Sequence, residues 1–172
     1  LLLYNDGNAY TYMFSLADDF SPFVDVNGDG DLDFLTFGLL STVQYYENQT
    51  IELGLPYDSI RFAAPVTCWG HFAEDAAAAS INLISCKSDG MSIINDEGDG
   101  SRHAGGSTIY GFDKEGDNDI DLVIGDFGWK KLTYLQNCGT NTNASMCLID
   151  SLFPVCDVPH SNIVYPTAFG LD

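Results

Sequence analysis

The stretch Asp25–Phe34, "DVNGDGDLDF", carries an oxygen-bearing side chain at every second position and then enters an apolar run. Like charges held this close repel one another and weaken a compact fold unless positive charge lies among them. The pattern therefore predicts a bound cation. Its candidate ligands are Asp25, Asn27, Asp29, Asp31 and Asp33.

The pattern returns at residues 113–121, "DKEGDNDID". Position 6 of the loop is Gly30 in the first copy and Asn118 in the second. A tight turn needs a left-handed backbone at this position, which Gly adopts freely and Asn tolerates better than most residues. The second copy is therefore expected to form the same loop, with candidate ligands Asp113, Glu115, Asp117, Asp119 and Asp121.

Calcium is the cation that suits these loops, because it takes about 6–8 oxygen ligands from side chains, carbonyls and water. We expect side-chain ligands at positions 1, 3, 5 and 9, and a backbone carbonyl at position 7, which is Asp31 or Asp119. Magnesium prefers a smaller octahedral shell rich in water. An EF-hand is excluded, because its glutamate at position 12 is replaced by Thr36 and Ile124. The sequence predicts two calcium sites.

The composition suits one globular domain, with 172 residues, 45% of them hydrophobic and 13% aromatic. The net charge is -19, from 25 acidic and 6 basic residues, which argues against a nucleic-acid partner. Nine of the 25 acidic residues lie in the two loops, so the charge is concentrated where a cation is expected. No apolar run reaches the roughly 18 residues of a membrane span.

Short runs rich in β-branched and aromatic residues, separated by Gly, Asn and Asp, predict an all-β architecture. The one helix-favouring run is Ala73–Ser80, "AEDAAAAS", which allows about two turns at most. The expected strands are Ala9–Phe14, Phe34–Phe37, Val43–Glu47, Ser80–Ile84, Ser107–Phe112, Leu122–Ile124 and Leu132–Gln136.

An internal repeat links the two loops to the strands that follow them. Residues 33–50, beginning "DFLTFG" and containing "YYEN", match residues 121–140, beginning "DLVIGD" and containing "YLQN". Units of a few strands cannot bury their own faces, so repeats must stack. We expect β-propeller-type repeats, about two to three blades of a closed ring, with an Asp-rich calcium loop between strands.

The ends of the sequence look like parts of further repeats. Phe169–Asp172 parallels Tyr110–Asp113, so a third loop would begin at Asp172 and be truncated there. Leu1–Tyr4 reads as the middle of a strand. We therefore expect the remainder of a longer chain to complete the propeller. The wide spacing between the two loops predicts an insertion at residues 51–102.

Five cysteines occur without a CxxC pair or zinc-site spacing. Disulfides are favoured over buried thiols, because calcium loops imply an extracellular setting. Cys68 and Cys86 bracket one segment and are the first choice for a pair. The pairing among Cys138, Cys147 and Cys156 stays open.

Several other features are interpreted as structural. Residues 95–100, "NDEGDG", lack a continuing oxygen series and are expected to form an exposed turn. The histidines are far apart in sequence, and the aromatic residues of the strands are expected to pack. These residues are His71, His103, His160, Tyr45, Tyr46, Trp129 and Tyr134.

The loop pattern, followed by "DFLTFG" or "DLVIGD" and a "YYEN" or "YLQN" strand, resembles the FG-GAP/VCBS repeats of calcium-binding β-propellers. Such repeats occur in integrin α-chains and bacterial surface proteins. The resemblance covers residues 20–50 and 103–140 and extends to 1–15 and 160–172. Residues 101–140 are similar to large secreted Bacteroidetes proteins that carry type IX sorting domains.

This resemblance implies a secreted or cell-surface domain with a non-catalytic role in adhesion, display or binding of a protein or glycan. The alternative is part of a secreted, carbohydrate-active enzyme whose catalytic groups lie in the propeller centre or elsewhere in the parent chain. A third possibility is an accessory scaffold in a larger complex. A concave pocket with convergent acid and base groups away from the calcium loops would favour the enzyme.

Overall fold

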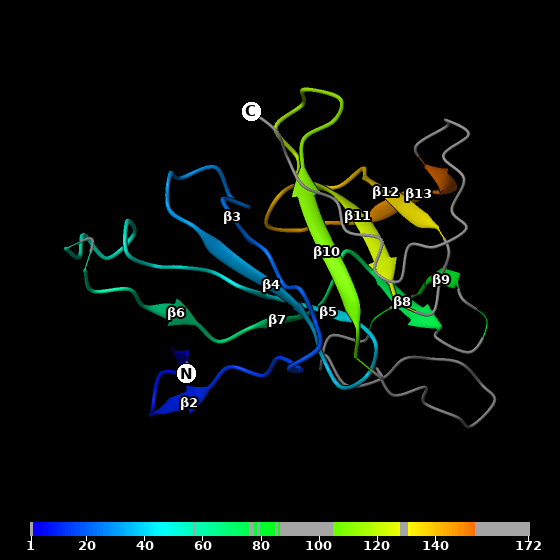
Figure 1. The fold of residues 1–172 in the computed structure, drawn as a ribbon. Helices are drawn as coiled ribbons and strands as arrows, with labels where there is room; N and C mark the ends of the chain where they lie inside the picture. Colours follow the sequence, from blue (N-terminus) through cyan, green and yellow to red (C-terminus); the bar gives the residue numbers. More distant parts are fainter. Residues whose placement is uncertain are drawn as a thin grey trace.

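The computed structural model describes residues 2–56, 58–75, 78, 80–84, 86, 105–127 and 131–153. These residues form strands and no helix, so the predicted all-β class is confirmed (Figure 1). None of the described residues belongs to a helix able to cross a membrane. The strands are β1 Leu3–Asn5, β2 Tyr10–Tyr12, β3 Phe23–Val24, β4 Asp33–Phe37, β5 Val43–Tyr46, β6 Phe62–Ala63, β7 Val66–Trp69, β8 Phe72–Asp75, β9 Ser80–Leu83, β10 Ser107–Phe112, β11 Asp121–Asp126, β12 Leu132–Asn137 and β13 Met146–Phe153.

Two four-stranded antiparallel sheets dominate the fold (Figure 1). Their strand orders are β3-β4-β5-β7 and β10-β11-β12-β13, so neighbours in each sheet follow one another along the chain apart from β6. β6 instead joins β1 and β2 in a small sheet, and β8 and β9 form a separate hairpin. The described residues form no closed sheet, and the propeller arrangement remains a prediction.

The two large sheets pair their second and third strands in the same register. Leu35 of β4 lies opposite Tyr45 of β5, and Val123 of β11 lies opposite Tyr134 of β12. These are the positions that the internal repeat aligns. The register therefore gives the repeat a structural meaning, because a shift by one residue would turn every side chain to the other face.

A shared hydrophobic core joins the two large sheets. Leu35 and Phe37 of β4 pack in one cluster with Leu122 and Ile124 of β11. The alternate residue Phe34 points to a second, smaller cluster, as the period of a strand requires. A backbone bond also links the segment before β3 to β10, where the Phe20 N–H donates to the Ser107 carbonyl at 2.9 Å. The sheets thus bury their faces against each other.

The helix-favouring run Ala73–Ser80 forms no helix in its described residues. Residues 73–75 belong to β8, Ser80 begins β9, and the Ala78 N–H donates to Asp75 Oδ1 at 3.0 Å in the turn between them. Phe72 at the start of β8 and Ile81 in β9 are both in the main core. Burial of these side chains in the hairpin outweighs the local helix propensity of the alanines.

The predicted insertion at 51–102 contains part of the first large sheet. β7 lies within this range and pairs with β5, where Trp69 lies opposite Val43. Trp69 is almost fully buried, and its indole N–H donates to the Asn141 carbonyl at 3.2 Å. The fourth strand of this sheet, β7, therefore belongs to a part of the sequence that shows no repeat pattern.

The predicted Cys68–Cys86 disulfide is confirmed, with a Cα–Cα distance of 6.4 Å. A second disulfide joins Cys138 and Cys147 across the β12–β13 connection, with a Cα–Cα distance of 5.8 Å. Both distances lie within the usual range for a disulfide. Two disulfides are compatible with an extracellular protein. Cys156 lies outside the described residues, as do 95–100, Trp129, His103, His160 and the start of a third loop at Asp172.

Candidate metal centres

The first loop, residues 25–33, connects β3 to β4 and is closed by its first carboxylate. Asp25 Oδ1 accepts hydrogen bonds from the N–H groups of Gly28 at 2.7 Å and Asp29 at 3.1 Å. Its Oδ2 accepts a third from Gly30 N–H at 3.0 Å. Gly30 has a φ of 96°, the left-handed conformation that the sequence predicts at position 6.

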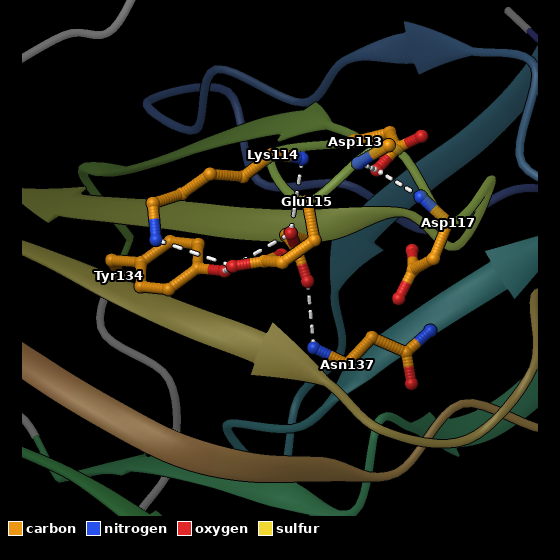
Figure 2. A network of polar contacts seen from close by, with 8 residues as sticks. Asp113, Lys114, Glu115, Asp117, Tyr134 and Asn137 are labelled. Atoms are coloured by element: carbon orange, nitrogen blue, oxygen red, sulfur yellow. Dashed lines mark hydrogen bonds and ion pairs between the residues drawn. The ribbon is translucent and has the colours of Figure 1, made fainter.

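The second loop, residues 113–121, connects β10 to β11 and repeats this geometry (Figure 2). Asp113 Oδ1 accepts from Gly116 N–H at 2.7 Å and Asp117 N–H at 3.2 Å. Its Oδ2 accepts from Asn118 N–H at 2.9 Å, and Asn118 has a φ of 67°. These bonds lower the pKa of Asp113, with the Asn118 bond the largest cause. Gly30 in the first loop and Asn118 in the second thus adopt the same left-handed conformation at position 6.

The last carboxylate of each loop is buried and hydrogen-bonded to the next strand, from β4 to β5 and from β11 to β12. Asp33 is 0% exposed and accepts hydrogen bonds from Asn48 N–H at 2.8 Å and the Tyr45 hydroxyl at 3.2 Å. Asp121 is 1% exposed and accepts from Asn137 N–H at 2.7 Å and the Tyr134 hydroxyl at 3.0 Å. Each also accepts from the residue at position 2, Val26 or Lys114. This shared network explains why Tyr and Asn recur in the repeat.

Burial raises the pKa of Asp33 to about 6, and burial likewise raises the pKa of Asp121 to about 6. The backbone hydrogen bonds from Asn48 and Asn137 work in the opposite direction and are outweighed. Each carboxylate therefore costs free energy when it is ionised in the folded state, because its charge is removed from water. Positive charge nearby would offset this cost.

The metal-free chain is expected to become more stable as the pH falls from 7 to 5. In the folded state Asp33 and Asp121 have a pKa of about 6, whereas unfolded aspartate has a pKa of about 4. The stability that protonation of the folded state adds is therefore lost as the pH rises through 6. The measurement is the melting temperature of protein stripped of metal and desalted. In saturating calcium the rise in melting temperature on going from pH 7 to pH 5 should be smaller, because protons compete with the ion for the carboxylates. A lower melting temperature at pH 5 in the metal-free protein would contradict this assignment.

Three acidic side chains meet beside the first loop. Asp29, Asp31 and Glu52 each offer a carboxylate oxygen, and these oxygens lie within 4.8 Å of one another. Glu52 belongs to the turn after β5 and is not among the predicted ligands. Its hydrogen bond with Asp29 is the main cause that raises the pKa of Glu52 to about 7. Among the residues that the structure describes, this is the one such group of three.

The second loop carries a positive charge of its own. Lys114 Nζ lies 3.2 Å from Glu115 Oε1 and 4.2 Å from the centre of the Tyr134 ring (Figure 2). The Tyr134 hydroxyl donates to Glu115 as well as to Asp121. The pKa of Glu115 is lowered, first by its hydrogen bond with Asp121 and then by Tyr134 and Lys114. In the first loop the matching position 2 is Val26, which is fully buried.

The structure places the predicted ligands in their loops but does not draw each full set together. The first and last carboxylates of each loop are engaged with N–H and hydroxyl donors. Asp117 is exposed and Asp119 is half-buried, with Asp117 Oδ1 accepting from Asp119 N–H at 3.1 Å. Among the described residues, the one group of three carboxylates joins Asp29 and Asp31 with Glu52, while in the second loop Glu115 and Asp121 share the Tyr134 hydroxyl.

The donors present fit a hard cation. They are all oxygen atoms, which calcium and magnesium prefer to the nitrogen and sulfur ligands of transition metals. Asp31 Oδ1 is buried and has no hydrogen-bond partner, a costly arrangement for a carboxylate that a cation would relieve. Comparisons with family models, curated proteins and solved structures found no match for this chain. The assignment of a metal centre therefore rests on geometry and on the sequence pattern.

Proposed function

We propose that the chain is a calcium-stabilised extracellular repeat domain that serves as a non-catalytic scaffold for adhesion, display or binding of a protein or glycan. The observation that carries the proposal is the equivalence of the two acidic loops. Each loop has the same turn closed by Asp25 or Asp113 and the same buried tie through Asp33 or Asp121. Each joins the first two strands of a four-stranded sheet.

The ligands would come from the loops themselves. Positions 1, 3, 5 and 9 supply side-chain oxygens, and position 7 supplies an additional oxygen. A bound calcium ion would neutralise carboxylates that otherwise repel one another beside a buried core. The chain has 25 acidic residues against 6 basic ones, so the benefit of such neutralisation is large.

The scaffold role follows from what the candidate ligands touch. Asp25 and Asp113 accept hydrogen bonds from the main chain of their own loops. Asp33 accepts from Asn48, just after β5, and Asp121 accepts from Asn137, at the end of β12. An ion bound among these groups would therefore fix strand connections. Two disulfides accord with an extracellular setting, where free calcium is abundant.

The test is to remove one ligand from each loop. Asp29→Ala and Asp117→Ala should each reduce the bound calcium from two ions to one, measured by isothermal titration calorimetry. Each should lower the melting temperature in calcium, and the double variant should no longer respond to chelator. Asp58→Ala is the control, because Asp58 is exposed and lies outside both loops.

Partner binding separates a structural metal from a functional one. If the proposal is correct, each variant loses binding to a surface partner only in conditions where it also unfolds. A variant that stays fully folded without calcium yet loses a specific activity would show that the metal acts directly in function, and the scaffold role would be wrong.

A further inference from the structure

The first loop contains a buried acceptor that its own fold leaves unsatisfied. Asp31 is only 8% exposed. Its Oδ2 accepts from Ile51 N–H at 3.1 Å, while its Oδ1 is buried without a hydrogen-bond partner. Leaving a buried acceptor unpaired costs about 1–3 kcal/mol, and more when the group is charged. This cost points to a ligand for the Asp31 side chain.

Glu52 is held beside Asp31 by the turn that follows β5. The Leu53 N–H donates to the Gln49 carbonyl at 3.1 Å, and the Gly54 N–H donates to the Ile51 carbonyl at 3.0 Å. The bond from Ile51 N–H to Asp31 then fastens this turn to the loop. The position of Glu52 is thus set by main-chain bonds on both sides of it.

The spacing of the three carboxylates suits one shared cation. Calcium–oxygen distances are about 2.3–2.6 Å, so two oxygens on one ion lie at most roughly 5 Å apart. The oxygens of Asp29, Asp31 and Glu52 lie within 4.8 Å of one another. Three carboxylates at this spacing repel strongly unless a proton or a cation lies among them.

The Asn27 side chain shows where positive charge is favoured in this group. Its amide Nδ2 donates to Asp29 Oδ2 at 2.8 Å and to Glu52 Oε1 at 3.3 Å. The positive end of an amide dipole therefore bridges two of the three acids. Asn27 Oδ1 accepts from Asp29 N–H at 3.1 Å. A half-turn of the amide would give up this bond and present the oxygen, which is a calcium ligand.

The second loop provides an internal comparison. Glu52 lies four residues after Asn48, and the residue four after the matching Asn137 is Asn141. Asn141 Oδ1 accepts from Ile120 N–H at 2.9 Å, and its Nδ2 donates to the Asn118 carbonyl. The same segment thus contacts the loop in both copies, through an acid in the first and a neutral amide in the second.

We propose that Glu52 is a cation ligand of the first loop and acts with the side chains of Asp29 and Asp31. This inference deepens the proposed function and rests on it. The ion would bind the loop and the turn after β5 together, so Asp31 contributes its carboxylate and not only its carbonyl. The second site has no acid at position 141, and the positive charge of Lys114 lies beside its Glu115 carboxylate. The first site therefore binds calcium more tightly than the second.

The test is calcium titration of the Asp117→Ala chain, which retains the first site alone, with and without Glu52→Gln. Glu52→Gln should weaken the remaining site by about tenfold or more, which corresponds to about 1.4 kcal/mol. Asp58→Asn is the matched control, because it removes the same charge from an exposed residue outside the site and should change the affinity little. Glu52 is exposed, so the substitution is expected to leave the fold intact, as circular dichroism can verify.

A second readout reports on the turn itself. Calcium should slow hydrogen exchange of the Ile51 amide in the natural chain, and this protection should fall in Glu52→Gln. Unchanged affinity and protection in Glu52→Gln, with two ions still bound by the natural chain, would overturn this inference and leave the proposed function intact. Failure of the natural chain to bind calcium at either loop would overturn both.

Discussion

Chelation of calcium is expected to lower the melting temperature of this chain by on the order of 10–20 °C. A ligand that binds only the folded state stabilises it by about 2.7 kcal/mol per site when its free concentration is about 100 times the dissociation constant. Two sites then supply roughly 5 kcal/mol. For a chain of this size, about 1 kcal/mol changes the melting temperature by roughly 2–4 °C.

The measurement is differential scanning calorimetry in millimolar calcium and in excess chelator at pH 7.4. The Asp29→Ala, Asp117→Ala double variant is the control, and its melting temperature should be the same in both buffers. Magnesium should restore little of the lost stability, because these loops supply many protein oxygens and magnesium keeps more of its water. Identical melting temperatures of the natural chain in calcium and in chelator would show that the loops do not stabilise the fold through the metal.

Asp33→Ala is expected to lower the free energy of unfolding by about 3–5 kcal/mol, even in chelator. The change removes the acceptor of three buried donors, and an unsatisfied buried donor costs about 1–3 kcal/mol. These donors are the N–H groups of Val26 and Asn48 and the hydroxyl of Tyr45. Asp121→Ala should behave alike, because the Asp121 carboxylate has the equivalent partners.

Urea unfolding measures this loss. Asp33→Asn is the matched control, because its amide oxygen can still accept a hydrogen bond while the charge is removed, and it should cost less than Asp33→Ala. Asp33 can stabilise the fold through its hydrogen bonds and through the metal. Repeating the unfolding experiment with and without calcium separates these two effects. If the loss in Asp33→Ala vanished in chelator, the carboxylate would act solely through the metal, and the hydrogen-bond network would not be the source of stability.

Local patterns were sufficient to predict the all-β class and much of the strand content. Asp33 followed by the apolar residues of β4, and Asp121 followed by those of β11, mark the entry into a buried central strand. The repeat also places Tyr45 and Tyr134 in equivalent positions, which the register confirms. These features are visible because loop chemistry and strand periodicity act over a few residues.

Other features depend on contacts between distant parts of the chain. The alanine-rich run at 73–80 favours a helix locally, yet Phe72 and Ile81 are buried in the core that the two sheets share. Glu52 has no recognisable motif around it, because its place beside Asp31 is set by the turn after β5. The buried ties from Asp33 to Tyr45 and Asn48 appear in the sequence as a repeat, but their physical cause appears only in the structure.

The central claim, that both acidic loops hold calcium, is tested most directly by a crystal structure of the chain grown in calcium, with anomalous scattering used to locate the ions. The account predicts one ion in the loop at residues 25–33 and one in the loop at 113–121, each with oxygen ligands at about 2.3–2.6 Å. It further predicts that Glu52 lies in the shell of the first ion. Loops free of anomalous density at saturating calcium, with their carboxylates still hydrogen-bonded only to N–H and hydroxyl groups of the protein, would contradict it.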